Sequence, residues 1–216
     1  VSGAVGQVRL AAVAVAEPLV AQALALLSTD SPDLELELAV GGIDVYADLE
    51  AGRCDLVVGD EINAARSRSS SALRITSLRT EPLVMLYRQS HPLAVTPDAT
   101  MTETLAYPWA IPSRYFSENR ALQELAEYAQ APGFPRYRLS SVAACIQLVA
   151  ASDVIGLVPQ TAALDARALG LMTADLAQPL TVPLATVTLA RAAPGPSVMR
   201  VQQVLRAAAE AIAQPV

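Results

Sequence analysis

Four loops of this 216-residue chain carry the residues best suited to holding a small molecule. Each follows a strand-like segment and leads toward a helix-like one, where unpaired backbone N–H groups can receive an anion. Ligands of open α/β sheets bind at the carboxyl ends of the strands, so we predict that these loops form one binding site. The loops are Ala14–Glu17, Gly41–Asp44, Ile111–Arg114 and Ser140–Val142.

The residues of these loops have both a binding interpretation and a plainer one. The predicted ligand contacts are Ala14, Val15, Ala16, Gly42, Ile43, Ser113, Arg114, Ser140, Ser141 and Val142. Ser141 could donate a hydrogen bond to a ligand carboxylate, and Arg114 could pair with the same group. A helix N-cap also explains the two serines, and a solvated surface position also explains Arg114. Gly41 and Gly42 also fit a tight turn.

The chain lacks the groups that most enzymes use for catalysis. All 15 basic residues are Arg, which excludes a lysine nucleophile, a lysine Schiff base and a Walker-type phosphate loop. His91 is the only histidine, which argues against a His-based metal site or hydrolytic triad. We interpret Cys54 and Cys145 as buried free thiols of a cytoplasmic protein. We therefore predict no catalytic residue, no metal, no cofactor and no enzymatic activity.

The composition indicates a well-packed protein that does not bind nucleic acid by itself. The chain is 53% hydrophobic and only 17% charged, which favours a large core. Its net charge of −6 opposes contact with phosphates, which supply most non-specific affinity for DNA. No apolar run reaches the roughly 20 residues that a membrane span needs. No signal peptide is visible before the first strand, so we expect a cytoplasmic protein without membrane contact.

The first sixty residues predict an alternation of strands and helices. The expected elements are a strand at 6–15, a helix at 17–28, a strand at 34–40, a short helix at 43–52 and a strand at 54–60. Three strands joined by helices favour a parallel sheet with right-handed crossovers. We interpret Asp60, at the end of the third strand, as the cap of a turn.

The rest of the chain predicts a second β/α unit and a return to the first. Residues 61–71 indicate a polar loop, and 73–94 indicate two strands broken near Glu81 and Pro82. The elements expected next are a strand at 107–111, a helix at 117–130, a strand at 136–139, a helix at 141–151, a strand at 152–159, an irregular stretch at 170–183, a strand at 184–192 and a closing helix at 197–213. We predict two lobes, one made of 1–80 and 182–216 and the other of 81–181.

Five landmarks follow one another along the chain in a recognisable order. They are GQVRLAAV, SPDLELELAVGG, LEAGRCDLVVGD, LVMLYRQSHPLA and SVAACIQLVAASDVIGLVP. Together they resemble the effector-binding domain of LysR-type bacterial transcriptional regulators over essentially the whole chain. The resemblance implies the α/β fold of type 2 periplasmic binding proteins, with two lobes, mixed sheets, helices on both faces and a ligand cleft between the lobes. It points to the same four loops.

The resemblance also implies a function and leaves two alternatives. The chain would sense a small-molecule effector and signal to a helix-turn-helix that is not in this sequence and through which DNA would be bound. Related sensors place Ser or Thr after the first strand, where this chain has Ala14, Val15 and Ala16 followed by Glu17. We therefore expect a less polar or a cationic ligand, or weak binding, rather than a plain carboxylate. An extracytoplasmic solute-binding protein would need a leader segment, and an enzyme would need an acid–base constellation.

The helix predicted at 17–28 suggests an assembly. Between positions 18 and 27 only Gln22 is polar, so this helix is apolar on nearly every side and needs a second cover. We predict a homodimer in which it packs against helix 197–213 of a second copy. Coverage of Leu19, Ala23 and Leu27 within one chain would count against this interface.

Overall fold

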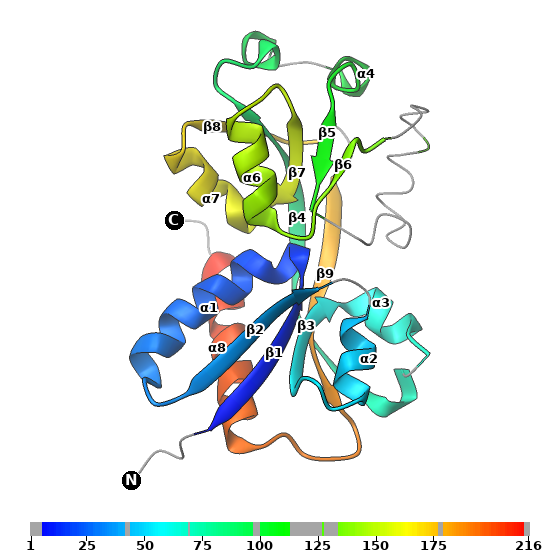
Figure 1. Cartoon of the computed structure of the whole chain (residues 1–216), viewed down its shortest axis with the longest axis vertical. Coiled ribbons are helices and arrows are strands. Elements are labelled where there is room, and N and C mark those ends of the chain that lie inside the picture. The colour runs from blue at the N-terminus through cyan, green and yellow to red at the C-terminus, as the bar shows by residue number, and fades with distance from the viewer. Residues whose placement is uncertain are drawn as a thin grey trace. The chain divides into compact units, whose positions relative to one another are not determined.

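The computed structural model describes residues 6–41, 44–68, 70–96, 100–112, 127, 134–176 and 179–213 (Figure 1). Its strands are β1 (Gln7–Val13), β2 (Glu35–Gly41), β3 (Leu56–Asp60), β4 (Leu73–Arg88), β5 (Trp109–Ile111), β6 (Tyr137–Arg138), β7 (Ile155–Pro159), β8 (Leu171–Ala174) and β9 (Leu180–Leu189). Its α-helices are α1 (Glu17–Asp30), α2 (Val45–Glu50), α3 (Glu61–Arg66), α4 (Met101–Thr104), α6 (Val142–Ala150), α7 (Gln160–Ala168) and α8 (Pro196–Ala213). Short 3-10 helices are η1 (Ala14–Ala16), η2 (Ser70–Ala72) and η3 (Pro92–Val95).

Contacts divide the chain into two compact units. Unit 1 comprises Val1–Thr80 and Pro183–Val216, and unit 2 comprises Glu81–Val182. The chain therefore passes from one unit to the other twice, once within β4 and once within β9. The sequence predicts lobe boundaries at 80/81 and 181/182.

Unit 1 is built on strands in the order β2-β1-β3-β9. β1 is parallel to both β2 and β3, and β9 runs antiparallel to β3. β3 is buried along its whole length, as expected for an apolar run inside a sheet, whereas β2 alternates exposed and half-buried residues. Because β1, β2 and β3 are parallel, their carboxyl ends at Val13, Gly41 and Asp60 share one edge of the sheet.

Unit 2 is built on strands in the order β4-β7-β5-β6, with β8 pairing β4. β5 is parallel to β6 and β7, and β4 runs antiparallel to β7 and β8. The buried face of α6 packs on this sheet through Cys145 and Val149. A side chain on Gly156 of β7 would meet the Val149 methyl at 2.9 Å, so the glycine permits this close helix–strand approach.

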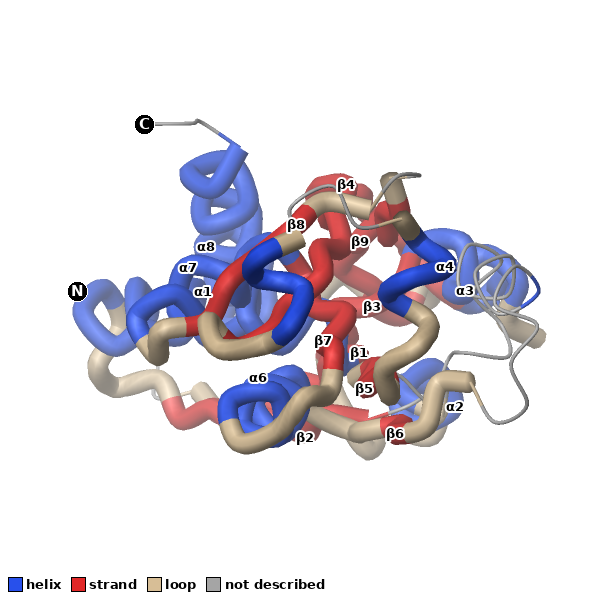
Figure 2. Tube along the Cα trace, turned by 90° about the horizontal axis from the view of Figure 1, so that it is seen from above, coloured by secondary structure: helices blue, strands red, loops and turns tan. Residues whose placement is uncertain are grey.

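The structure shows how the apolar helix α1 is covered. Leu19, Ala23 and Leu27 of α1 are only 1%, 1% and 4% exposed, all within one chain. α8 of the same chain packs against α1 in both views (Figures 1 and 2). The closing helix is thus the second cover of α1, but it comes from the same chain. This coverage within one chain counts against the predicted homodimer through these two helices, because it removes the need for a cover from a second copy.

Several element predictions also fail. Residues 61–66 form α3 rather than loop, and 170–183 contain β8 and the start of β9. β4 continues through Pro82 without a break, and its ladder with β7 begins at the following residue, Leu83. A proline is tolerated where no ladder bond requires its N–H. The helix predicted at 117–130 lies outside the described residues except at Glu127. None of the described helices is long and apolar enough to cross a membrane.

Candidate ligand-binding site

The loop after β1 offers backbone and methyl groups but no hydroxyl. Ala14, Val15 and Ala16 form η1 and are all buried. α1 starts directly after them, and no side chain caps its first turn, which contains Glu17 and Pro18. This edge of unit 1 therefore carries an acidic residue beside an apolar loop, as the sequence predicts.

The second predicted loop leads into a junction that the sequence analysis missed. Gly42 and Ile43 lie outside the described residues, and α2 begins just after them. The hydroxyl of Tyr46 in α2 donates a hydrogen bond of 2.8 Å to the backbone carbonyl of Asp60, and both residues are buried. Burial, helped by the nearby Asp60 carboxylate, raises the pKa of the Tyr46 phenol, so it remains a donor. Gly59 provides the space: a Cβ there would lie 2.4 Å from the Tyr46 Oη.

Asp60 caps a helix rather than a turn. Its Oδ1 accepts the N–H groups of Ile62 at 2.8 Å and Asn63 at 3.2 Å, which makes it the N-cap of α3. Burial raises the pKa of the Asp60 carboxyl, and the two N–H bonds oppose this rise. Tyr46 and Asp60 together tie α2, β3 and α3 at the carboxyl edge of the sheet. No short sequence motif marks this junction.

Unit 2 brings two of the predicted loops together at a helix N-terminus. The N–H of Leu139 donates to the carbonyl of Ile111 at 3.0 Å, so the chain after β5 runs beside the chain after β6. The Oγ of Ser141 accepts the N–H groups of Ala143 at 3.1 Å and Ala144 at 3.4 Å and caps α6. Ser140 is exposed and Val142 is buried. Ser113 and Arg114 lie outside the described residues.

The ion pair between Arg9 and Asp55 explains two of the sequence landmarks. Arg9 Nη2 lies 2.7 Å from Asp55 Oδ1, and Arg9 Nε lies 3.2 Å from Oδ2, which also accepts the Arg9 N–H at 2.9 Å. These bonds lower the pKa of the Asp55 carboxyl. The pair ties β1 to the approach of β3 at the amino-terminal edge of the unit 1 sheet, opposite the carboxyl ends of β1 and β2.

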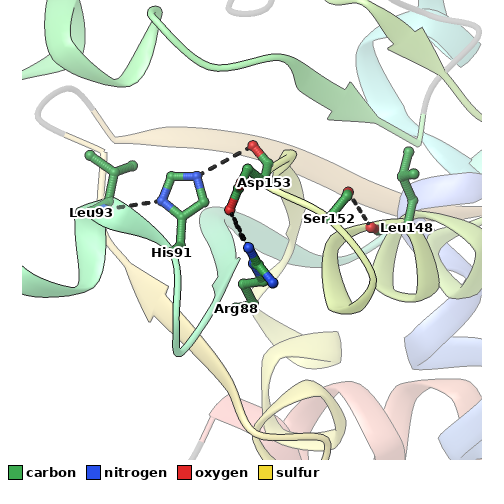
Figure 3. Close-up of polar contacts among 6 residues, drawn as sticks. All are labelled: Arg88, His91, Leu93, Leu148, Ser152 and Asp153. Carbon is green, nitrogen blue, oxygen red and sulfur yellow. Dashed lines mark hydrogen bonds and ion pairs between the residues drawn. The ribbon is translucent and has the colours of Figure 1, made fainter.

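The single histidine has a structural role in unit 2 (Figure 3). His91 is 1% exposed, and its Nδ1 accepts the N–H of Leu93 at 3.0 Å, at the start of η3. The ring proton therefore belongs on Nε2, which lies 3.3 Å from the carbonyl oxygen of Asp153. The carboxylate of the same Asp153 pairs with Arg88 at 2.8 Å. Within the described part of the chain, no group of three or more acidic, Cys or His residues could hold a metal.

Acidification is expected to destabilise the protein through His91. Burial lowers the pKa of its imidazole below the unperturbed value of about 6.5. The unfolded chain then binds more protons than the folded one below about pH 6.5, so the free energy of unfolding falls as the pH drops through that value. Urea unfolding between pH 8 and 5.5 measures this slope. His91→Asn, which keeps an acceptor for Leu93, should be less stable at pH 8 but show a smaller slope; an unchanged slope would contradict the assignment.

A comparison with known protein families identifies the class of this protein. The model of the family described as "LysR substrate binding domain" matches residues 2–210, nearly the whole chain. The protein therefore belongs to this family, whose members are LysR-type transcriptional regulators. The fold is the two-lobed α/β fold of type 2 periplasmic binding proteins, and the predictions of family and fold class are confirmed.

Solved structures of bacterial regulators share the fold at low sequence identity. A protein of Vibrio parahaemolyticus described as a transcriptional regulator is 19% identical, with a TM-score of 0.79 over 99% of this chain and 100% of that one. The regulatory domain of Synechocystis CcmR, in complex with 2-PG, is 20% identical, with a TM-score of 0.73 over 95% and 98%. The regulatory domain of MetR from N. meningitidis is 20% identical, with a TM-score of 0.70 over 97% and 96%. No curated protein sequence matches the chain.

Proposed function

We propose that this chain is the effector-binding domain of a bacterial LysR-type regulator, which binds a small organic molecule in a cleft between its lobes. The observation that carries the proposal is the family match over residues 2–210. Loops at the carboxyl ends of parallel strands support it, since ligands of such sheets bind there. The CcmR regulatory domain, which has this fold, is described in complex with 2-PG. Binding would shift the population of lobe arrangements, and this shift would reposition a DNA-binding part that lies outside this chain.

The chemistry of the loops indicates the kind of effector. In unit 2, Ser140 and Ser141 place two hydroxyls at the start of α6. In unit 1, the loop Ala14–Ala16 has no hydroxyl and is followed by Glu17. A ligand carboxylate would gain no hydrogen bond from a side-chain hydroxyl there. We therefore propose a neutral effector that offers hydrogen-bond acceptors to Ser141 and Arg114 and whose apolar part lies against Ala14–Ala16.

The proposal includes what the domain does not do. We propose that it carries out no catalytic turnover and binds DNA only through the helix-turn-helix of a full regulator, in the cytoplasm. LysR regulators are dimers or tetramers. We propose that any assembly of this domain uses surfaces other than the contact between α1 and α8, because that contact is satisfied within one chain.

An effector found by calorimetry is expected to lose affinity when either predicted polar contact is removed. The metabolites titrated into the protein include neutral and cationic compounds, carboxylates of similar size and 2-PG. Ser141→Ala and Arg114→Ala should each weaken the best ligand about tenfold, or about 1.4 kcal/mol. Arg206→Ala, an exposed arginine on α8, is the control and should leave affinity unchanged. Titrations run well below the melting temperature, because Ser141 also caps α6. Equal affinity in all three variants would contradict the proposed site, and a best ligand that is a carboxylate would contradict the proposed class.

A further inference from the structure

The turn at residues 91–96, which contains η3 and follows β4, is attached to unit 2 by few buried groups. Among its residues only His91 and Leu93 are buried, at 1% and 6% exposed, whereas Val95 is 87% exposed. Two of its backbone hydrogen bonds close within the turn itself, from the Ala94 N–H to the His91 carbonyl at 2.9 Å and from the Thr96 N–H to the Leu93 carbonyl at 3.0 Å. A surface segment with so few buried contacts can open locally at much less cost than unfolding the whole unit.

The hydrogen bond between the two buried residues of this turn requires a neutral histidine. His91 Nδ1 accepts the N–H of Leu93 at 3.0 Å (Figure 3). An imidazolium carries a proton on both ring nitrogens and has no acceptor left. Protonation of His91 therefore breaks this bond and leaves two donors, the Nδ1–H and the Leu93 N–H, facing each other in a buried place. Buried donors without an acceptor are costly, so the closed turn resists protonation.

The other groups around the imidazole do not offset this loss. Its Nε2 lies 3.3 Å from the carbonyl oxygen of Asp153, and it can donate to that oxygen in both protonation states. The Asp153 carboxylate favours the imidazolium, but the Arg88 guanidinium, paired with that carboxylate at 2.8 Å, opposes it. The rings of Tyr107 and Tyr87 pack beside the imidazole, with centroids 4.5 Å and 5.7 Å away. Burial outweighs these influences and lowers the pKa of His91.

We propose that His91 is a pH-sensitive latch, whose protonation at Nδ1 opens the 91–96 turn while the rest of unit 2 stays folded. The open turn returns the imidazolium to water and lets the Leu93 N–H bond to solvent. Because the closed turn binds the proton more weakly than the open one, acid favours the open turn. Opening should therefore increase as the pH falls below about 6.5, the value for an unperturbed histidine. This local opening is distinct from global unfolding, which acid also favours through the same residue.

Amide hydrogen exchange of the whole chain, followed by NMR at about pH 7.5 and about pH 5.5, tests the latch. The protection factor of the Leu93 amide should be at least about threefold lower at the lower pH, because the open turn binds the proton more tightly. The slowest amides of the buried strand β7 are the internal control, since they report the opening of the whole unit. Urea below the unfolding transition should speed their exchange but hardly affect that of Leu93, because a local opening exposes little surface.

His91→Asn is the matched variant, because an asparagine side chain can accept the N–H two residues ahead and does not titrate. Its Leu93 amide should be equally protected at the two pH values. Three results would overturn the proposal: equal protection of Leu93 at both pH values in the unsubstituted protein, an unchanged pH dependence in His91→Asn, and a urea dependence of Leu93 equal to that of the slowest β7 amides. The first and third come from the unsubstituted protein, so the test holds even if the variant does not fold. No effector is needed, so the outcome is separate from that of the proposed function.

Discussion

Replacing Glu81 by Ala is expected to lower the free energy of unfolding by about 3 kcal/mol, because it removes one partner of a buried, charged hydrogen-bond group. Glu81 lies in β4 and is 1% exposed. Its Oε1 accepts the N–H of Thr161 at 2.9 Å, and both carboxylate oxygens accept the Thr161 hydroxyl, at 2.8 and 2.9 Å. Thr161 is in the first turn of α7, where a carboxylate also complements the helix dipole. Loss of the carboxylate leaves the N–H and the hydroxyl of Thr161 buried without this acceptor.

Urea unfolding at pH 7 measures this loss, with Glu210→Ala on the exposed face of α8 as the control. The control should stay within about 0.5 kcal/mol of the unsubstituted protein. A double-mutant cycle of Glu81→Gln and Thr161→Val should show a coupling energy of about 1 kcal/mol or more, as for residues in one network. Additive effects, or a loss below 1 kcal/mol for Glu81→Ala, would show that this contact does not anchor α7.

Gly59→Ala is expected to cost about 1–3 kcal/mol, the usual range for an atom added to a packed core. The new Cβ would lie 2.4 Å from the Oη of Tyr46, 3.1 Å from its Cζ and 3.2 Å from its Cε1. Tyr46 is buried and bonded to Asp60, so its ring cannot move aside without breaking that bond. The strain would fall on α2, which follows the predicted ligand loop Gly41–Asp44.

The background Tyr46→Phe tests this explanation. It removes the closest contact but keeps the ring contacts, so Gly59→Ala should cost less there than in the unsubstituted protein. Gly195→Ala is the matched control: no atom lies within 4 Å of its added Cβ, so its effect should stay within about 0.5 kcal/mol. Chemical unfolding of the unsubstituted protein, the single variants Gly59→Ala and Tyr46→Phe, their double variant and the Gly195→Ala control gives the comparison. Costs that are equal in the two backgrounds would mean that the tyrosine hydroxyl is not the obstacle.

Local patterns in the sequence were sufficient for much of the fold. The apolar runs predict β1, β3 and β7 because buried parallel strands need apolar residues on both faces. The alternation of Leu and Glu predicts β2 because only one of its faces is covered. Ser141 is identified as a cap by its position before an apolar helix.

Contacts between distant residues could not be predicted in this way. The cover of α1 by α8 joins residues about 170 positions apart, as for Arg200 and Asp30, and no local pattern distinguishes it from a contact with a second copy. Glu81 and Thr161 are 80 positions apart, and Tyr46 and Asp60 are 14 apart. α3 is only 6 residues long, too short for a helical period to show, and an acid at the end of a strand indicates a turn as readily as a helix cap.

The most direct test of the central claim is a crystal structure of this chain with its best ligand bound. We expect a small molecule between the lobes, in contact with Ala14–Glu17, Gly41–Asp44, Ile111–Arg114 and Ser140–Val142. Its polar atoms should lie within hydrogen-bond distance of Ser141 or Arg114, and its apolar part should lie against Ala14–Ala16. A ligand bound elsewhere, with all four loops free of contact, would contradict the claim that this domain senses an effector at the carboxyl ends of its strands.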